Sequence, residues 1–317
     1  MSRRELDAAG ITDPALRDAY EACRALHAEH GRTYYLATRL LPPGTRPFVH
    51  ALYGFARYAD EIVDDLGSAL SPQQRADELA RWGDVVLADL ARGHSVDPIA
   101  RALVDTATRF AIPHEHVADF LASMRMDLTV TEYRTFDDLG RYVHGSAAVI
   151  GREMVHVLGT TDPADLPEAL ARADDLGVAF QLANFIRDVG EDLDRGRVYL
   201  PLDELAAFSV SRADLERRVL TPQIRLALEE QVHRVRMLQA RAEPGIALLR
   251  PEAQPCIRAA SELYCGIVDA VEDIDFQVFD RRARVGNARR LRVAGAAWVE
   301  AVRARRGAAR ARTASRP

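Results

Sequence analysis

The stretch Phe180-Gln181-Leu182-Ala183-Asn184-Phe185-Ile186-Arg187-Asp188-Val189-Gly190-Glu191-Asp192 combines an apolar helix with one row of oxygen-bearing side chains. On a helix that advances about 100° per residue, Gln181, Asn184, Asp188 and Asp192 fall within roughly 80° of one another. Most of the other positions are apolar, so the sequence predicts a largely buried helix with a polar stripe. Amide and carboxylate oxygens in one row suit Mg²⁺, which prefers oxygen ligands and substrate phosphates.

A second segment, ALYGFARYADEIVDD from position 51, repeats this pattern. Tyr53, Arg57, Asp60 and Asp64 share one stripe, while the neighbouring positions are apolar or small. A solvated acidic face is the alternative for either segment alone, because Asp and Glu are usually exposed. The occurrence of two such helices favours carboxylates that clamp Mg²⁺ ions around a diphosphate. The arginine on each helix would add fixed positive charge to such a site.

The composition excludes several classes of chemistry. The chain has 317 residues, and all of its 42 basic residues are arginine. A Schiff-base lysine, pyridoxal phosphate chemistry and a lysine-containing phosphate loop are therefore excluded. A formal net charge of −5 argues against bulk nucleic-acid binding, and three cysteines without CxxC spacing argue against a disulfide framework or a thiolate metal site.

Helix-forming residues dominate the whole chain, and apolar residues recur at steps of three and four. Breakers such as Ser71-Pro72, Asp97-Pro98 and Thr221-Pro222 predict helix starts with a cap residue followed by proline. No fixed repeat and no Gly/Ser linker divides the sequence. We therefore expect an all-α fold with one domain over residues 14–300. An N-terminal extension would cover residues 1–13, and a basic, disordered tail would cover residues 301–317.

The N-terminal residues contain no apolar core of signal-peptide length, and no run approaches the ~18 apolar residues of a membrane span. These features predict a cytoplasmic protein. The basic C-terminal residues are compatible with an electrostatic contact with anionic lipid, although a solvated tail is the simpler expectation.

The acidic segments resemble those of the squalene and phytoene synthases, which are head-to-head prenyl transferases with one Asp-x-x-x-Asp motif on each side of a cavity. The resemblance covers about residues 20 to 290. It rests on both acidic segments and on QLANFIRDVGEDLDRGRVYLP (Gln181–Pro201), HGRTYY (His30–Tyr35), LLP (Leu40–Pro42), YRTF (Tyr133–Phe136) and YCGIVD (Tyr264–Asp269). Members of the family often have Ser at the position of Gly31 and Tyr at the position of His144.

This resemblance implies a single-domain isoprenoid-synthase helical bundle around a central cavity, with two or three Mg²⁺ ions. The implied metal ligands are Asp60, Asp64, Asn184, Asp188 and Asp192. The implied catalytic residues are Asp60, Asp64, Asp188, Asp192, Tyr53 and Arg57. The implied substrate-binding residues are His30, Gly31, Arg32, Thr33, Tyr53, Arg57, Gln181, Arg187 and Tyr264. Each tyrosine is equally well explained as a core residue from the sequence alone.

As the resemblance implies, the expected activity is that of a phytoene synthase. Such an enzyme condenses two geranylgeranyl diphosphates through a cyclopropyl diphosphate, needs no NADPH and serves carotenoid biosynthesis. Release of a hydrocarbon product would involve peripheral membrane contact. An enzyme that converts farnesyl diphosphate to dehydrosqualene, squalene or presqualene diphosphate is the nearest alternative. A non-catalytic helical scaffold derived from this fold is an alternative from another class, and the oligomeric state is left open.

Overall fold

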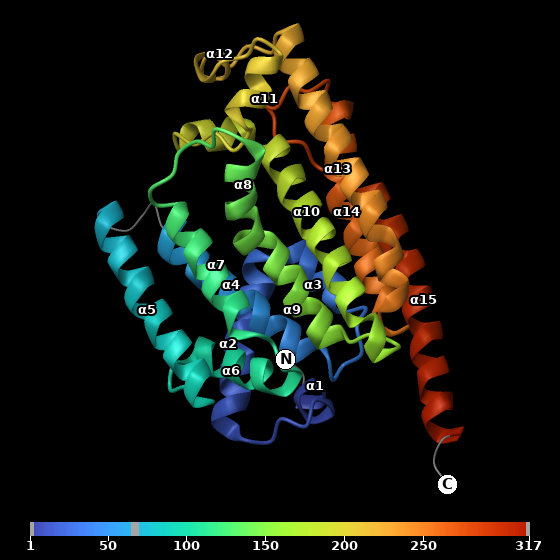
Figure 1. Cartoon of the computed structure of the whole chain (residues 1–317). Helices are drawn as coiled ribbons and strands as arrows, with labels where there is room; N and C mark the ends of the chain where they lie inside the picture. Colours follow the sequence, from blue (N-terminus) through green and yellow to red (C-terminus); the bar gives the residue numbers. More distant parts are fainter. Residues whose placement is uncertain (1–2, 65–69, 315–317) are drawn as a thin grey trace.

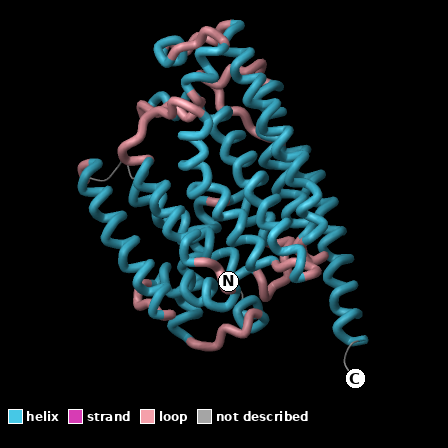
Figure 2. The backbone as a smooth tube through the Cα atoms, viewed as in Figure 1, coloured by secondary structure: helices cyan, strands magenta, loops and turns pink. Residues whose placement is uncertain are grey.

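The computed structural model describes residues 3–64 and 70–314, with the side chains of Arg32, Thr33, Asp64, Pro72 and residues 309–314 outside the description. Within this part the chain forms helices and loops and no strand (Figure 2). The helices are α1 (Arg3–Ala8), α2 (Pro14–His30), α3 (Arg32–Thr38), α4 (Arg46–Asp64), α5 (Pro72–Arg92), α6 (Pro98–Phe110), α7 (His114–Met126), α8 (Phe136–Val143), α9 (Val149–Leu158), α10 (Leu166–Asp194), α11 (Leu202–Ala207), α12 (Arg212–Glu216), α13 (Pro222–Leu248), α14 (Gln254–Asp273) and α15 (Asn287–Ala314). The all-α prediction is confirmed.

The helix starts follow the capping signals of the sequence. The side chains of Ser71, Asp97 and Thr221 accept backbone hydrogen bonds from the first turns of α5, α6 and α13, and each cap is followed by proline. A proline at the first helical position does no harm because its missing N–H would have no partner there. These three predicted starts are therefore confirmed.

The longest described helix, α10, runs through the bundle and packs on α9, α13 and α14, while α2 packs on α4 and α6 (Figure 1). One apolar cluster joins α2, α4, α6 and α7, and a second joins α8, α10, α13 and α14. A π-helical turn at His144–Ala148 connects α8 to α9. No described helix is long and apolar enough to cross a membrane.

The C-terminal region differs from the sequence-based expectation. Helix α15 continues to Ala314 through residues for which the composition predicts a disordered tail. Alanine and arginine are strong helix formers, and the side chain of Ala301 is fully buried. Helix propensity, together with the packing of Ala301 in the core, thus accounts for the helix beyond residue 300.

One buried carboxyl group makes the stability of this fold depend on pH. Glu153 on α9 is fully buried, and neither carboxyl oxygen has a hydrogen-bond partner within the described residues. Burial raises the pKa of this group from 4.5 to about 8, because an apolar environment disfavours the charged form. The folded state therefore keeps a proton that the unfolded state loses between these two pH values.

We predict that the free energy of unfolding falls by about 3 kcal/mol between pH 4.5 and pH 7 because of Glu153, at about 1.4 kcal/mol per pKa unit. The Glu153→Gln variant should lack this part of the fall, since an amide does not titrate. Urea unfolding at several pH values measures the difference, and any constant cost of the substitution cancels between them. Parallel pH profiles for the two proteins would contradict the assignment.

Candidate active site

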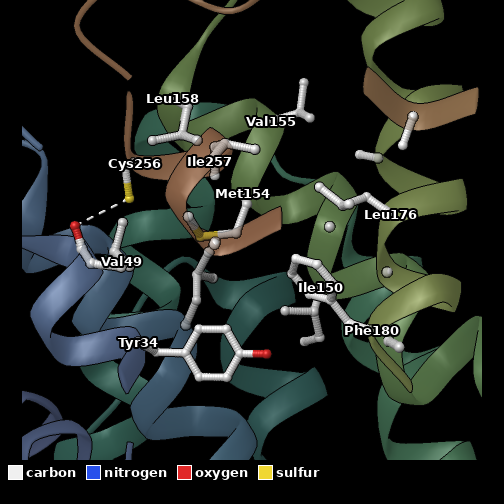
Figure 3. Close-up of a pocket in the computed structure, with 18 of the residues that line it drawn as sticks. Tyr34, Val49, Ile150, Met154, Val155, Leu158, Leu176, Phe180, Cys256 and Ile257 are labelled. Atoms are coloured by element: carbon white, nitrogen blue, oxygen red, sulfur yellow. Dashed lines mark hydrogen bonds between the residues drawn. The ribbon is translucent and has the colours of Figure 1, made fainter. Parts of the chain in front are cut away.

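A large apolar cavity of about 320 Å³ lies in the centre of the bundle. Its walls come from α2, α3, α4, α7, α9, α10, α13 and α14, together with the π-helical turn. Figure 3 shows Ile150, Met154, Leu176 and Phe180 pointing toward the same space, with Tyr34 on the other side. Because most of the lining is aliphatic or aromatic, the cavity is suited to a hydrocarbon chain.

Both acidic motifs begin one helical turn beyond the lining of this cavity. The lining of α10 starts at Ala169 and ends at Asn184, and the lining of α4 ends at Ala56. Asp188 and Asp60 follow four residues later on their helices, which is one further turn. The ring of Tyr53 on α4 lies 6.5 Å from that of Tyr34, which stacks on Tyr264 beside Arg187, so the two helix ends lie on the same side of the cavity. That the two motifs face one another stays a prediction.

Arginines surround the second acidic motif. The guanidinium of Arg187 donates to both oxygens of Asp188, with Nε at 2.7 Å from Oδ1. Arg282 lies across from them, with Nε at 3.2 Å from the same Oδ1 and Nη1 at 3.0 Å from Glu191. The site thus already holds the positive groups that bind phosphate oxygens.

Asp192 forms no ion pair within the described residues, although the charges of Arg195 and Arg197 act to lower its pKa. Burial, together with the charge of Asp188, outweighs them and raises this pKa to about 7. A cation beside both carboxylates would remove this penalty. The donor chemistry at this end of α10 therefore fits a hard divalent cation such as Mg²⁺.

The first acidic motif has a similar arrangement. Arg57 donates from Nη1 to Asp60 at 2.6 Å and from Nε to Glu61 at 3.2 Å. His30 at the end of α2 brings its Nε2 to 3.2 Å from Glu61. Glu61 thus links two predicted residues, His30 and Arg57, and Arg57 pairs directly with a third, Asp60.

Three predicted residues, Arg32, Thr33 and Asp64, have side chains outside the described part of the structure. Among the side chains that are described, no three His, Cys, Asp or Glu residues lie close enough together to hold a metal ion. The predicted ligand set, Asp60, Asp64, Asn184, Asp188 and Asp192, therefore stays a prediction.

Tyr53 forms part of an aromatic stack in the cavity wall. Its ring lies on His27, with centroids 3.9 Å apart and an interplanar angle of 8°. His27 in turn shares a 2.9 Å Nδ1–Nδ1 hydrogen bond with His50, and burial lowers the pKa of His27 to about 3. The rings of Tyr53 and His27, which both line the cavity, are therefore uncharged at neutral pH. A Cβ on Gly31 would lie 2.5 Å from the Tyr53 ring, so glycine leaves room for it.

Tyr264 separates the apolar cavity from a second, basic one. Its ring stacks on Tyr34 with centroids 4.1 Å apart and lies 5.0 Å from Phe180. Tyr34 and Phe180 face the apolar cavity, whereas Tyr264 faces the other. This second cavity also has a volume of about 320 Å³, and four arginines contribute to its lining: Arg187, Arg282, Arg284 and Arg290. An anionic group and an apolar chain can thus be held on either side of one aromatic partition.

The sequence interpretation missed the arginines of the segment after α14. Arg282 lies 94 residues from Asp188 along the chain, and it follows an irregular loop that no periodicity describes. The only available signal was the concentration of arginine in RRAR at positions 281–284. His144 pairs with Asp119 at 3.3 Å and is not among the described residues that line the cavity.

Comparison with known proteins identifies the family. The sequence model of the squalene/phytoene synthase family matches residues 27–289. The chain belongs to this family. The phytoene synthase of Arthrospira platensis is 37% identical over 286 residues, which cover 86% of this chain and 90% of that one. The 15-cis-phytoene synthase of Synechocystis sp. is 35% identical over 297 residues, covering 90% of this chain and 86% of that one.

Solved structures of the family share the fold. The squalene synthase HpnC from Alicyclobacillus acidocaldarius has a TM-score of 0.76 at 25% identity, covering 85% of this chain and 98% of that one. A dehydrosqualene synthase solved in complex with a ligand has a TM-score of 0.80 at 24% identity, covering 89% of this chain and 96% of that one. The predicted isoprenoid-synthase helical bundle is confirmed.

Gly190 controls the approach of the arginine segment to α10. A Cβ at this position would lie 2.6 Å from the carbonyl oxygen of Phe279 and 2.8 Å from that of Val278. Backbone atoms cannot rotate away, so any side chain here would push the segment from the helix. Arg282 would then move away from Asp188.

We predict that Gly190→Ala lowers kcat/KM for a prenyl diphosphate by about tenfold or more, because small displacements of charged groups at an active site are costly. The matched control is Gly140→Ala on α8, where a Cβ would meet no atom within 4 Å. Steady-state kinetics with both variants measures the effect. Equal activity of Gly190→Ala and the wild type would show that the contact has no role in positioning Arg282.

Proposed function

We propose that the protein is a phytoene synthase that condenses two molecules of geranylgeranyl diphosphate head to head through a cyclopropyl diphosphate. The observation that supports this most is the placement of two acidic, arginine-rich helix ends at the mouth of one long apolar cavity. The phytoene synthases at 35–37% identity support the same proposal.

Departure of diphosphate from the allylic carbon is the first barrier. Mg²⁺ held by Asp60, Asp64, Asn184, Asp188 and Asp192 would supply the charge that makes diphosphate a competent leaving group. Arg57, Arg187 and Arg282 orient the diphosphate and stabilise its developing negative charge through fixed donors. These arginines pair with the carboxylates of the two motifs.

The allylic cation formed next needs walls that do not react with it. The aromatic faces of Tyr53, Tyr34 and Phe180 line the cavity near its mouth, and such faces attract a cation. The double bond of the second substrate attacks this cation, and loss of a proton to the released diphosphate closes the ring of the cyclopropyl diphosphate. A second ionisation, rearrangement and loss of a proton then give the hydrocarbon. The cavity favours this outcome because its apolar lining excludes water.

The length of the cavity favours the longer substrate. The lining of α10 extends over about 15 residues from Ala169 to Asn184, or about 22 Å at 1.5 Å per residue. An extended geranylgeranyl chain has about 16 carbons in its main chain and spans roughly 19 Å with bonds near 1.5 Å. A farnesyl chain spans roughly 14 Å on the same basis and would leave the far end unfilled.

The product also requires an apolar phase, because a hydrocarbon of about 40 carbons is almost insoluble in water. Peripheral contact with a membrane would give it such a phase, and no span is needed for that contact. We include this contact in the proposed function as the route of product release.

The direct test is product identification. The purified protein should convert geranylgeranyl diphosphate and Mg²⁺ to phytoene without NADPH, as measured by mass spectrometry. Asp188→Asn should lose at least about 100-fold in rate, since a charge that stabilises the transition state is removed. Asp194→Asn is the matched control, because Asp194 lies on the same helix but pairs with Arg218 away from the cavity. A product made only from farnesyl diphosphate would overturn the substrate, and no product from either substrate would favour the scaffold.

A bulky side chain in the cavity should change the substrate preference. Ala173 lies on the lining of α10, about 11 residues before Asn184, and thus about 16 Å from it. We predict that Ala173→Phe lowers turnover of geranylgeranyl diphosphate by about tenfold or more and retains turnover of farnesyl diphosphate, because only the longer chain reaches that depth. The control is Ala171→Phe on the exposed face of the same helix. A parallel loss with both substrates would contradict the proposed chain path.

A further inference from the structure

Helix α15 leaves large apolar side chains in solvent. Leu291 is 74% exposed, Trp298 is 59% exposed and Val299 is 41% exposed. The opposite side of the helix packs on α14 and is formed by Val293, Ala297 and Ala301. The exposed residues therefore take no part in the packing of the helix on α14. They lie together on the outer surface of this 28-residue helix.

The charged residues of α15 also differ between its two sides. The one acidic residue, Glu300, pairs with Arg258 of α14 at 3.0 Å, and Arg289 pairs with Asp269 at 2.7 Å. The arginines flanking the apolar surface are exposed and form no ion pair within the residues that the structure describes; they are Arg292, Arg303 and Arg306. The outer surface thus combines exposed apolar groups with charge of one sign.

We propose that this outer surface of α15 docks the protein onto an anionic lipid bilayer. Trp and Leu side chains reach the headgroup boundary of a bilayer, and arginines beside them pair with lipid phosphates. Aggregation through this face is opposed because the arginines of two copies would repel one another. The helix is about 42 Å long, and it extends along the outside of α14 and past the rest of the bundle at its C-terminal end (Figure 1).

Docking on this side has a consequence for product release, which rests on the proposed function. Cys256, Ile257 and Ala260 of α14 line the apolar cavity, and the same helix supports α15. One helix therefore separates the cavity from the docking surface. A hydrocarbon made in the cavity would leave close to a phase that dissolves it.

The test is flotation of the full-length protein with vesicles of phosphatidylcholine, with and without about one third phosphatidylglycerol. We expect binding to the anionic vesicles only. Binding should be weaker at about 0.5 M than at about 0.1 M salt, because salt screens the attraction between arginine and lipid phosphate. Leu291→Ser/Trp298→Ser and Arg303→Gln/Arg306→Gln should each lower the partition coefficient by about tenfold or more. The control is Val219→Ser/Met237→Ser, which changes two residues that are 61% and 53% exposed elsewhere on the protein.

The proposal is overturned if the wild type does not float with anionic vesicles, or if the α15 variants float as well as the control. A dimer in sedimentation that Trp298→Ser abolishes would also overturn it, because the surface would then bind a second copy. Turnover in detergent should be the same for all variants. Vesicle binding does not require catalysis, so a protein that docks through α15 but makes no phytoene would refute the proposed function alone.

Discussion

The concentration of negative charge at the mouth of an apolar cavity is the constraint on which the rest of the structure depends. Carboxylates at the ends of α4 and α10 would repel one another and lose solvation there without positive partners. Arg57, Arg187 and Arg282 supply part of that compensation within the chain. Burial and the charge of Asp188 raise the pKa of Asp192 to about 7. A metal ion held by these carboxylates, as we propose, would supply further positive charge.

The fold serves this site through the central helix α10. One side of the helix lines the apolar cavity, and its last turns present the polar row that begins at Gln181 and ends at Asp192. Gly190 lets the Arg282 segment approach the motif closely. The Tyr34–Tyr264 stack then divides the apolar cavity from the basic one. An apolar and a basic environment thus lie on opposite sides of one pair of stacked rings.

Much of this could be predicted from the sequence, and the limits have physical causes. The polar rows on α4 and α10 follow from helical periodicity, and the starts of α5, α6 and α13 follow from capping residues. Arg282 was missed because its contact with Asp188 is made by an irregular segment, for which no periodic pattern exists. The helix beyond residue 300 was missed because composition does not reveal that Ala301 packs against a neighbour. Long-range contacts, rather than local propensity, account for both differences.

The claim that both acidic motifs bind one metal–diphosphate cluster is tested most directly by crystallography. The measurement is the anomalous scattering of Mn²⁺ in crystals grown with a non-ionisable thiodiphosphate analogue of the substrate. We predict Mn²⁺ peaks at about 2.2 Å from carboxylate oxygens of both motifs, with the prenyl chain in the apolar cavity. Metal bound at one motif only, or an analogue whose chain lies outside the cavity, would contradict it.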